Sequence, residues 1–578
     1  MGITYTDCDL HCGPRGSTEA FDWQPFSVAI LQWLFPWLAL TAQLPYETRH
    51  RGSNVMALML AVGSPMLITY SLFITILNAR WLNVHFGRLR SQNEQRGRRS
   101  RQVVMLSAAL FVLKEIQHVP IVISETRRRF AQLVVNPTNE RWWVALREQL
   151  KRTKREFTYS LGAQAFFVVV LAFMAMVNFM VMIDRFTVRV FGVAINNIWM
   201  WMIPVTVGWV WVGTQNSANT IRECLMEASS KAVFLPDLTT HHGHQGMGRG
   251  GRDTIGFQDW SWENRDDLES AGTELHQQPA RLGRVQTVPP VKQIYEGCKG
   301  EAGPIFNYAR FPSHLQTCAL VIDMFKTLNM RLHEDATVRV PVARNSEWHY
   351  DSDNDEPTKT ETETGWKKNL DGTPEEIEAW LFPNNPVPTF SHSINVPLIF
   401  IQAFVVAAVL QWGTTGAAVW LAYQTPVVGL GCVSGSYFLY GVAATLVWFL
   451  MVFSAYLSHC HAADLSNPSI HMPPLRRMAL EFLIPATRYV GKGLAVLNSF
   501  WVLAFTLLQF AGRYQNCWCM SVMGRGGWVI LWADDQQIAE IAWNSWVGSS
   551  IMVSVTVIIV GVLVLNTQGE EIYERQTQ

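Results

Sequence analysis

Charged residues are scarce in this chain of 578 residues, at 16% of the sequence. A typical soluble protein carries about 25%. The shortage is concentrated in eight apolar runs that contain no Asp, Glu, Lys, Arg or His. This pattern excludes an ordinary soluble globular protein. It also argues against pumps and ion-coupled carriers, which usually place ionisable groups along their pathway inside the membrane.

Catalytic and modification motifs are missing as well. The chain has no Gly-x-Ser-x-Gly nucleophile elbow, no His-Glu-x-x-His zinc motif and none of the histidine boxes of membrane desaturases. The Asn-x-Ser/Thr triplets at Asn136 and Asn467 have proline in the middle position, which prevents glycosylation. These absences indicate a protein that is not an enzyme. No catalytic residue, cofactor or nucleic-acid partner is predicted.

Nine cysteines are scattered along the chain, in a pattern that is not a disulfide framework. Cys517 and Cys519 are the candidate disulfide residues, because their loop is predicted to face an oxidising compartment. A bond between these two residues would be strained by their close spacing.

Metal-ligating side chains gather just after the sixth apolar run, where His459, His461 and His471 are weak candidate ligands. Imidazole nitrogens bind zinc and copper well. Adjacent residues rarely converge on one ion, however, and no Cys-x-x-Cys pair accompanies them. A solvated helix end is the preferred interpretation, and no metal site is predicted.

What the chain does contain is eight apolar runs of about the length that crosses a bilayer, since a core about 30 Å thick requires roughly 20 helical residues. The runs are Phe26–Leu44, Val55–Asn78, Leu161–Ile183, Phe191–Gly213, Val396–Leu421, Val428–Leu457, Gly493–Ala511 and Val547–Asn566. They predict an all-α membrane protein with about eight transmembrane helices, arranged as four helices, a cytosolic insert and four further helices.

The runs divide the chain into segments of different character. These are an N-terminal tail (1–25), a first helix pair (26–79), a basic cytosolic loop with amphipathic helices (80–160), a second pair (161–213), a cytosolic insert (214–395), a third pair (396–457), a cytosolic loop (458–492), a fourth pair (493–566) with an outer loop (512–546), and a C-terminal tail (567–578). Within the insert, 236–291 and 345–378 lack periodicity, and we expect the cytosolic loops to be partly disordered.

Orientation follows from the 17 Lys and Arg residues of the loop 80–160, because each short loop on the opposite face holds two at most. The positive-inside rule places the basic loop in the cytosol. Threading the runs then puts both termini inside and the 512–546 loop outside or in a lumen. We expect a multi-pass protein of the plasma membrane or an endomembrane.

The first run leaves an alternative open, because Pro36 lies in its middle. If 26–44 is re-entrant, the N-terminus lies outside, on the same face as Cys517 and Cys519. Proline in the middle of a span is also tolerated in ordinary membrane helices, so the spanning interpretation is favoured.

Several shorter elements are predicted between the runs. Val103–Leu113 is expected to form a buried helix, and Gln132–Val135 a short strand or turn. A helix is expected to start near Ser313, because serine is a good N-cap. Pro474–Lys492 is expected to be a cytosolic helix lying on the membrane surface.

The segment 141–157 predicts an amphipathic helix. Trp142, Trp143, Leu146 and Leu150 fall at helical spacing on one side, with cations on the other. Two interpretations are equally supported. The helix packs on the cytosolic domain, or it lies on the bilayer and binds anionic lipids. The lipid bilayer and unknown cytosolic proteins are therefore the predicted partners.

Small and neutral polar residues within the runs predict helix packing. Gly431 and Gly435 form a G-x-x-x-G pattern, which is typical of close helix contact. Gly63, Ser64 and Pro65 predict a kink. The neutral polar residues are Asn178, Asn196, Asn197, Gln402, Gln411, Asn498 and Gln509. We favour interhelical hydrogen bonding for them over a polar pathway for a neutral solute.

Three stretches resemble a known family. They are YTDCDLHCGPRGSTEAFDWQPFSVAILQWLFPWLALTAQLP near the N-terminus, SLFITILNARWLN, and LREQLKRTKREFTYSLGAQ. They are similar to a family of uncharacterised multi-pass membrane proteins of filamentous fungi, over roughly the first 200 residues. The resemblance implies a fungal source and a membrane location, and it carries no activity or functional residue.

The sequence thus favours a non-enzymatic membrane sensor or scaffold whose cytosolic segments bind partners or lipid. The alternative is a channel or carrier for a neutral or lipophilic solute, lined by the neutral polar residues of the spans.

Overall fold

The fold was analysed in a computed structural model, and part of the chain is described. The described residues are 2–12, 21, 23–42, 44, 51–94, 101–117, 127–136, 139–153, 166, 170, 194–195, 197–212, 218–229, 232, 304–334, 374–382, 396–424, 429–466, 473–514, 516, 519, 528–530 and 535–576. The expected irregular segment 236–291 and nearly all of 345–378 lie outside them, as does the run 161–183 apart from Phe166 and Val170.

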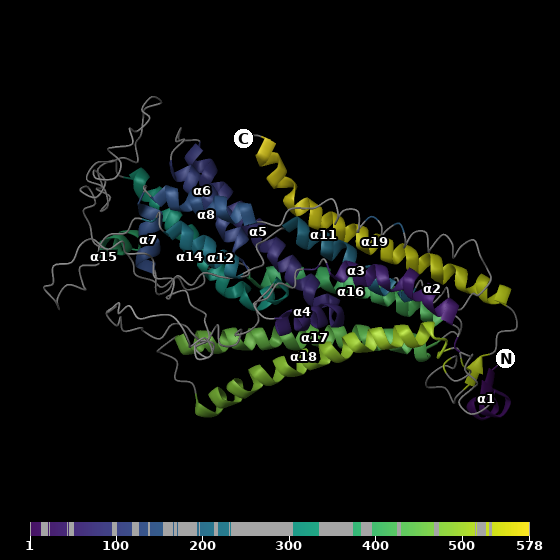
Figure 1. Ribbon diagram of the computed structural model, residues 1–578. Helices are drawn as coiled ribbons and strands as arrows, with labels where there is room; N and C mark the ends of the chain where they lie inside the picture. Colours follow the sequence, from purple (N-terminus) through teal and green to yellow (C-terminus); the bar gives the residue numbers. More distant parts are fainter. Residues whose placement is uncertain are drawn as a thin grey trace, which may run out of the picture.

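Helices make up the described fold, apart from one short two-stranded ribbon (Figure 1). The elements are β1 (Gly2–Thr4), α1 (Tyr5–Cys12), α2 (Trp23–Trp33), α3 (Phe35–Thr41), α4 (Arg51–Gly63), α5 (Pro65–Glu94), α6 (Arg101–Glu115), α7 (Arg127–Val135), α8 (Glu140–Thr153), α11 (Met202–Val212), α12 (Ala218–Ser229), η5 (Pro304–Phe306), α14 (Asn307–Glu334), α15 (Pro374–Leu381), α16 (Val396–Gln424), α17 (Cys432–Ser466), α18 (Pro474–Phe510), β2 (Trp528–Ile530) and α19 (Asp535–Gln576).

Among the described residues, five helices are long and apolar enough to cross a membrane. They are Pro65–Gln92, Pro397–Gln424, Cys432–His461, Pro474–Phe510 and Ser545–Leu565. Shorter apolar helices cover Phe26–Leu38, Asn54–Gly63 and Asn197–Val212. The prediction of a helical membrane protein is confirmed in this coarser form, while the count of eight spans stays a prediction.

The long helices form a bundle in which α16, α17 and α18, consecutive in the chain, run antiparallel to one another, while α5 and α17 run parallel. The Tyr437 hydroxyl donates to Gln509, and the Ser454 hydroxyl donates to the carbonyl of Ile484, so α17 and α18 run in opposite directions. The Thr556 side chain lies against Gly413, and this contact joins α19 to α16. One end of the bundle carries the disulfide of Cys432 and is called the disulfide end.

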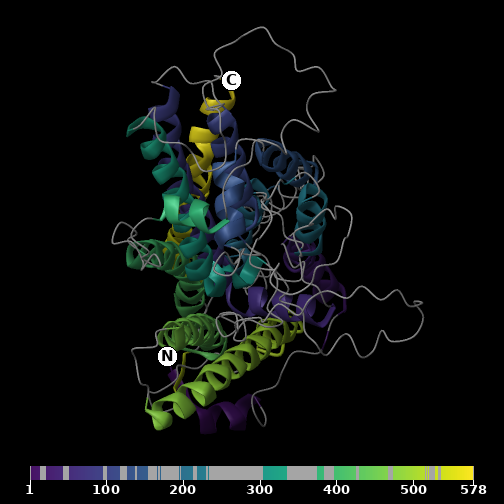
Figure 2. The ribbon, with the colours of Figure 1, turned by 90° about the vertical axis from the view of Figure 1, so that its left-hand side faces the viewer.

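A second core lies at the other end, called the domain end (left in Figure 1; facing the viewer in Figure 2). It combines α6, α7, α8, α12 and α15 with the last turns of α5 and the middle of α14, and it is called the helical domain. The basic loop and the later insert therefore pack into one body. Helices α5 and α14 contribute side chains to both cores.

The sequence predicted several domain elements correctly and others wrongly. The buried helix expected at Val103–Leu113 is α6, and it is confirmed. The strand or turn expected at Gln132–Val135 is wrong, because these residues end helix α7. Helix α14 begins at Asn307, before Ser313, and includes Pro312. Helix α18 is continuous from Pro474 into the span, so no break separates a surface helix from a membrane helix.

The N-terminal strand pairs antiparallel with β2, with Ile3 opposite Val529. Residues 2–4 therefore lie at the disulfide end, beside the 512–546 loop, while α19 carries the C-terminus toward the domain end (Figure 1). On which face of a membrane each terminus lies stays a prediction.

The first apolar run is divided between two short helices, α2 and α3, which meet at Leu34. Pro36 occupies the first turn of α3, where its missing N–H is tolerated. Helix α4 then runs from the disulfide end toward the domain end, since Met59 lies beside Ser499 and Gly63 beside Ala495. Strand β1 and the first turn of α4 thus lie toward the same end of the bundle, and whether 26–44 spans the membrane or is re-entrant stays open.

Candidate functional site

The candidate site is the break between α4 and α5, inside the apolar bundle. Helix α4 ends at Gly63, Ser64 is non-helical and α5 begins at Pro65. Proline has no backbone N–H, so the carbonyl four residues earlier loses its usual donor. The predicted kink is confirmed. Backbone freed in a membrane needs partners from neighbouring helices.

Two neighbouring helices provide these partners. The Tyr440 hydroxyl of α17 donates to the carbonyl of Val62 at 2.8 Å. The Asn498 amide of α18 donates to the carbonyl of Gly63 at 2.7 Å and to that of Tyr440 at 3.1 Å. The Ser64 hydroxyl donates to the carbonyl of Ala444 at 2.7 Å. The last two carbonyls of α4, those of Val62 and Gly63, therefore accept hydrogen bonds from side chains of α17 and α18.

Close backbone approach accompanies these hydrogen bonds. The Ser499 hydroxyl donates to the carbonyl of Met59 at 2.6 Å. A Cβ atom added to Gly63 would collide with the backbone carbonyl of Ala495. Glycine is needed here for contact with α18. The site is thus a tight three-helix junction of α4, α17 and α18.

The glycine pattern singled out in the sequence lies elsewhere. Gly431 precedes α17, and its N–H donates to the Ser434 hydroxyl at 2.9 Å, while Gly435 lies in the first turn. Their role in close packing stays a prediction. Tight contacts are made instead by Gly63, by Gly441 against Trp412, and by Gly208 against Leu72.

The predicted polar residues of the spans are mostly buried in hydrogen bonds between or within helices. Asn197 donates to Ser549 at 3.1 Å, and Gln411 donates to Thr415 at 2.9 Å. Gln402 is exposed on the surface of α16. Asn178 and Asn196 lie outside the described residues. This placement favours the packing interpretation over a continuous polar pathway.

Several buried side-chain polar atoms in the described bundle have no hydrogen-bond partner. They include Gln411 Oε1, Thr206 Oγ1 and Gln509 Nε2, as well as the indole nitrogens of Trp199, Trp201 and Trp448. A buried polar group without a partner costs about 1–3 kcal/mol, so these atoms are the positions at which a polar ligand would gain most.

A second polar cluster joins the bundle to the helical domain along α5. The Ser71 hydroxyl donates to the carbonyl of Ile305 at 2.6 Å. Asn307 donates to the Thr75 hydroxyl at 2.6 Å. The Asn78 amide donates to Gln117, at the end of α6, at 2.9 Å. These bonds, called the α5 seam, tie the insert and the basic segment to one helix.

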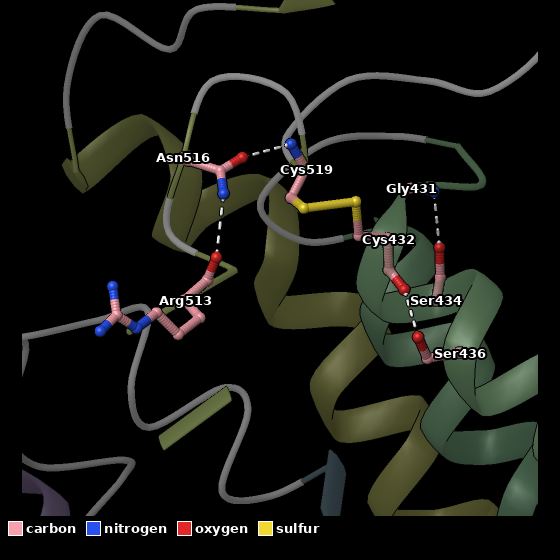
Figure 3. Close-up of a disulfide and its surroundings, with 7 residues drawn as sticks. All are labelled: Gly431, Cys432, Ser434, Ser436, Arg513, Asn516 and Cys519. Atoms are coloured by element: carbon pink, nitrogen blue, oxygen red, sulfur yellow. Dashed lines mark hydrogen bonds between the residues drawn. A yellow bond between two sulfur atoms is a disulfide. The ribbon is translucent and has the colours of Figure 1, made fainter. Parts of the chain in front are cut away.

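The disulfide end is closed by a bond between Cys432 and Cys519, whose Cα atoms are 4.8 Å apart (Figure 3). Gly512, at φ 72°, ends α18 in the left-handed conformation that suits glycine and turns the chain back. The Cys519 N–H donates to Asn516, which donates to the carbonyl of Arg513.

The disulfide includes one of the two candidate residues from the sequence. Cys519 is bonded to Cys432, 87 positions earlier, and not to Cys517. Residues so close in sequence cannot easily bring their Cβ atoms into disulfide geometry. Cys517 itself lies outside the described residues.

The weak metal candidates are only partly placed. His459 and His461 lie on α17 near the domain end, and His461 is largely buried. His471 lies outside the described residues. Within the described part of the chain, no group of three His, Cys, Asp or Glu side chains is arranged to hold a metal ion.

Sequence reasoning missed Tyr440 and Ser499 as members of the site, and it named Ser64 only as part of the kink. The available signal was the Gly-Ser-Pro sequence inside an apolar run, since a break there exposes carbonyls that need donors. Asn498 was singled out as a polar span residue. Its acceptors on α4 and α17 follow only from the packing.

Comparison with known proteins adds no relative. No family model matches the chain, and no curated protein or solved structure is significantly similar to it. The resemblance to fungal membrane proteins therefore stays a prediction.

Proposed function

We propose that this protein is a non-enzymatic membrane scaffold or sensor, in which the apolar bundle holds a helical domain that binds partners. The observation that carries this proposal is α5. This helix runs from the core of the bundle into the core of the domain, and the α5 seam ties three of its residues to the insert and to α6. A change in the bundle at the Ser64 break would move this helix.

The chemistry of the two ends supports a cytosolic domain. The domain end holds most of the basic segment, while the disulfide lies at the opposite end. The free cysteines among the described residues are Cys224 and Cys318 in the domain and Cys460 near the domain end of α17. Disulfides persist in oxidising compartments and thiols in the cytosol. The distribution of cations and the distribution of disulfide and free cysteines therefore indicate the same orientation, with the domain in the cytosol.

Cysteine-labelling or reporter fusions test this orientation. Reporters after residues 100, 240 and 570 should all indicate the cytosol, and a tag before Met1 should indicate the opposite face. An external signal at residue 100 would contradict the orientation. A cytosolic N-terminal tag would contradict the re-entrant arrangement alone.

Proximity labelling tests the scaffold role. A labelling enzyme fused to the C-terminus should mark a reproducible set of cytosolic proteins. Truncation of Trp143 in the domain core should remove this set while membrane insertion is kept. The matched truncation of Trp420, which is half exposed on α16, should keep it. An identical set for both variants would contradict binding through the domain.

A carrier for a neutral solute is the second candidate, favoured by the broken helix and the partnerless Gln411 and Thr206 atoms. Reconstituted vesicles that accumulate a neutral solute, and lose this flux in Gln411→Leu with folding intact, would replace the scaffold proposal. Proton-driven uptake of charged solutes is not expected, because the predicted runs lack ionisable groups.

A further inference from the structure

Helix α18 is longer than a membrane crossing requires. Its 37 residues extend about 55 Å at roughly 1.5 Å per residue. The hydrocarbon core of a bilayer is about 30 Å thick, which needs roughly 20 residues. Counting back from Phe510, the crossing is complete near Gly491. The segment Pro474–Val490, called the surface segment, lies beyond it at the domain end.

Burial divides α18 at the same place. Nine residues between Gly491 and Phe510 are buried in the bundle, but Ile484 is the single buried residue of the surface segment. The Ser454 hydroxyl donates to the carbonyl of Ile484 at 2.8 Å, next to Pro485. The N-terminal part of α18 diverges from α17 (Figure 1).

One face of the surface segment is apolar and exposed. Leu475 is 75% exposed, Phe482 74% and Tyr489 73%. Met478 and Val490 are also exposed. Spacings of three, four and seven residues place side chains on one side of a helix. An apolar stripe of this width has to be covered, because large exposed apolar patches mark interaction surfaces.

Cations accompany this face. The surface segment contains Arg476, Arg477 and Arg488, against one carboxylate, Glu481. Arg477 pairs with Glu481 at 2.8 Å, an exposed contact within the helix. Three cations and one carboxylate leave two net positive charges. An amphipathic helix with basic residues beside its apolar face suits an anionic membrane surface.

We propose that the surface segment docks on the headgroups of acidic phospholipids, with its apolar face in the interface of the leaflet at the domain end. Two features of the surface segment identify acidic phospholipids as its binding partner, namely its position relative to the hydrocarbon core and its net charge. The segment continues directly from a crossing helix, so it leaves the hydrocarbon at headgroup level, and its net charge is opposite to that of acidic lipids. Docking fixes the direction in which α18 leaves the bundle. The choice of leaflet rests on the proposed orientation.

Hydrogen–deuterium exchange of the full chain in nanodiscs tests the docking. Nanodiscs expose both bilayer faces, so the result does not depend on cellular orientation or on protein partners. Amides of the surface segment should exchange more slowly in phosphatidylcholine discs with added phosphatidylserine than in phosphatidylcholine alone. The difference should shrink as salt is raised.

The double variant Arg476→Gln/Arg477→Gln should lose most of this protection. Two cations at about 1 kcal/mol each correspond to roughly 30-fold weaker docking. The matched control Lys151→Gln/Arg152→Gln removes two exposed cations from α8 in the domain and should leave the surface segment unchanged.

The variant Phe482→Ser removes apolar contact and should reduce protection at every lipid composition. Equal exchange in neutral and acidic discs would overturn the proposal. So would equal effects of the α18 and α8 double variants.

Discussion

The bundle and the helical domain are both built from helices, yet their interiors differ. The junction of α4, α17 and α18 is held by glycine contact and by Asn, Ser and Tyr hydrogen bonds, while large apolar side chains such as Phe449 and Ile558 face outward. Both cores bury aromatic rings, such as Trp199 and Phe505 in the bundle and Trp142 and Trp143 in the domain, but the domain core is packed mainly by large apolar side chains. Trp143 packs edge-on against Trp142 and Phe130.

The two regions differ because the bundle is surrounded by lipid and the domain by water. Lipid tails are as apolar as leucine, so apolar burial gives little net gain between membrane helices, and small residues and hydrogen bonds select the contacts. In water, the burial of apolar surface drives association. Truncation of a large apolar side chain should therefore destabilise the domain strongly when it is in the domain core, and should change stability little when it is on the lipid-facing surface of the bundle.

The largest expected effect is Trp143→Ala in the domain. Trp143 is 1% exposed, contacts Phe130 and Phe325, and donates to the carbonyl of Leu133 at 3.0 Å. The cavity should cost about 3–5 kcal/mol. Faster hydrogen exchange should appear in α7, α8 and α14. Trp420→Ala on the lipid-facing side of α16 should change exchange little, and equal losses from both variants would contradict the comparison.

Acid should weaken the domain through His314. Burial lowers the pKa of this imidazole from 6.5 to about 4. The unfolded chain takes up the proton first as the pH falls through 6.5, so the stability present above pH 6.5 is lost between there and pH 4. The loss amounts to about 3 kcal/mol.

Domain unfolding followed by hydrogen exchange at several pH values checks this, with His314→Gln as the comparison. The variant should have a flatter profile. Burial raises the pKa of Asp323, which acts in the opposite direction and cancels in the difference. Parallel profiles for both chains would show that His314 does not titrate in this way.

The third expected effect is in the bundle. Gly63→Ala should cost about 1–3 kcal/mol, because the added methyl group meets backbone that cannot rotate away. Thermal unfolding in detergent measures it. Gly493→Ala is the matched control, since its added Cβ meets no atom within 4 Å. If both variants unfold at the same temperature, the close contact of α4 with α18 is not what stabilises the junction.

The smallest expected effect is that of Asn498→Leu, at about 1–2 kcal/mol in the same assay, because the carbonyl of Gly63 loses its donor. Gln402→Leu removes an exposed amide from α16 and should be neutral. A larger loss in Gln402→Leu would indicate that the polar residues of the spans serve another purpose.

Local patterns predicted much of the fold. The apolar run at 103–113 became α6, the spacing of Trp142, Trp143, Leu146 and Leu150 gave the buried face of α8, and Gly63-Ser64-Pro65 gave the kink. Burial of that α8 face supports packing on the domain, while binding of anionic lipid by 141–157 stays a prediction. Of the misassigned residues 132–135, Leu133, Val134 and Val135 are apolar, and the stretch becomes helical because these three side chains pack within the domain.

The candidate site was less predictable, because its parts are distant in sequence. Ser64 and Ala444 are separated by 380 positions, and Asn498 and Gly63 by 435. No spacing rule links such residues.

By itself, the sequence determined the membrane class, the helical character and the basic segment, because hydrophobic length, periodicity and charge are local properties. Only the tertiary structure decided the partner of Cys519, the end at which β1 lies, the union of the basic loop with the insert, and the donors that cap α4. These depend on which helices meet, and that is settled by shape and hydrogen-bond complementarity between segments far apart in the chain.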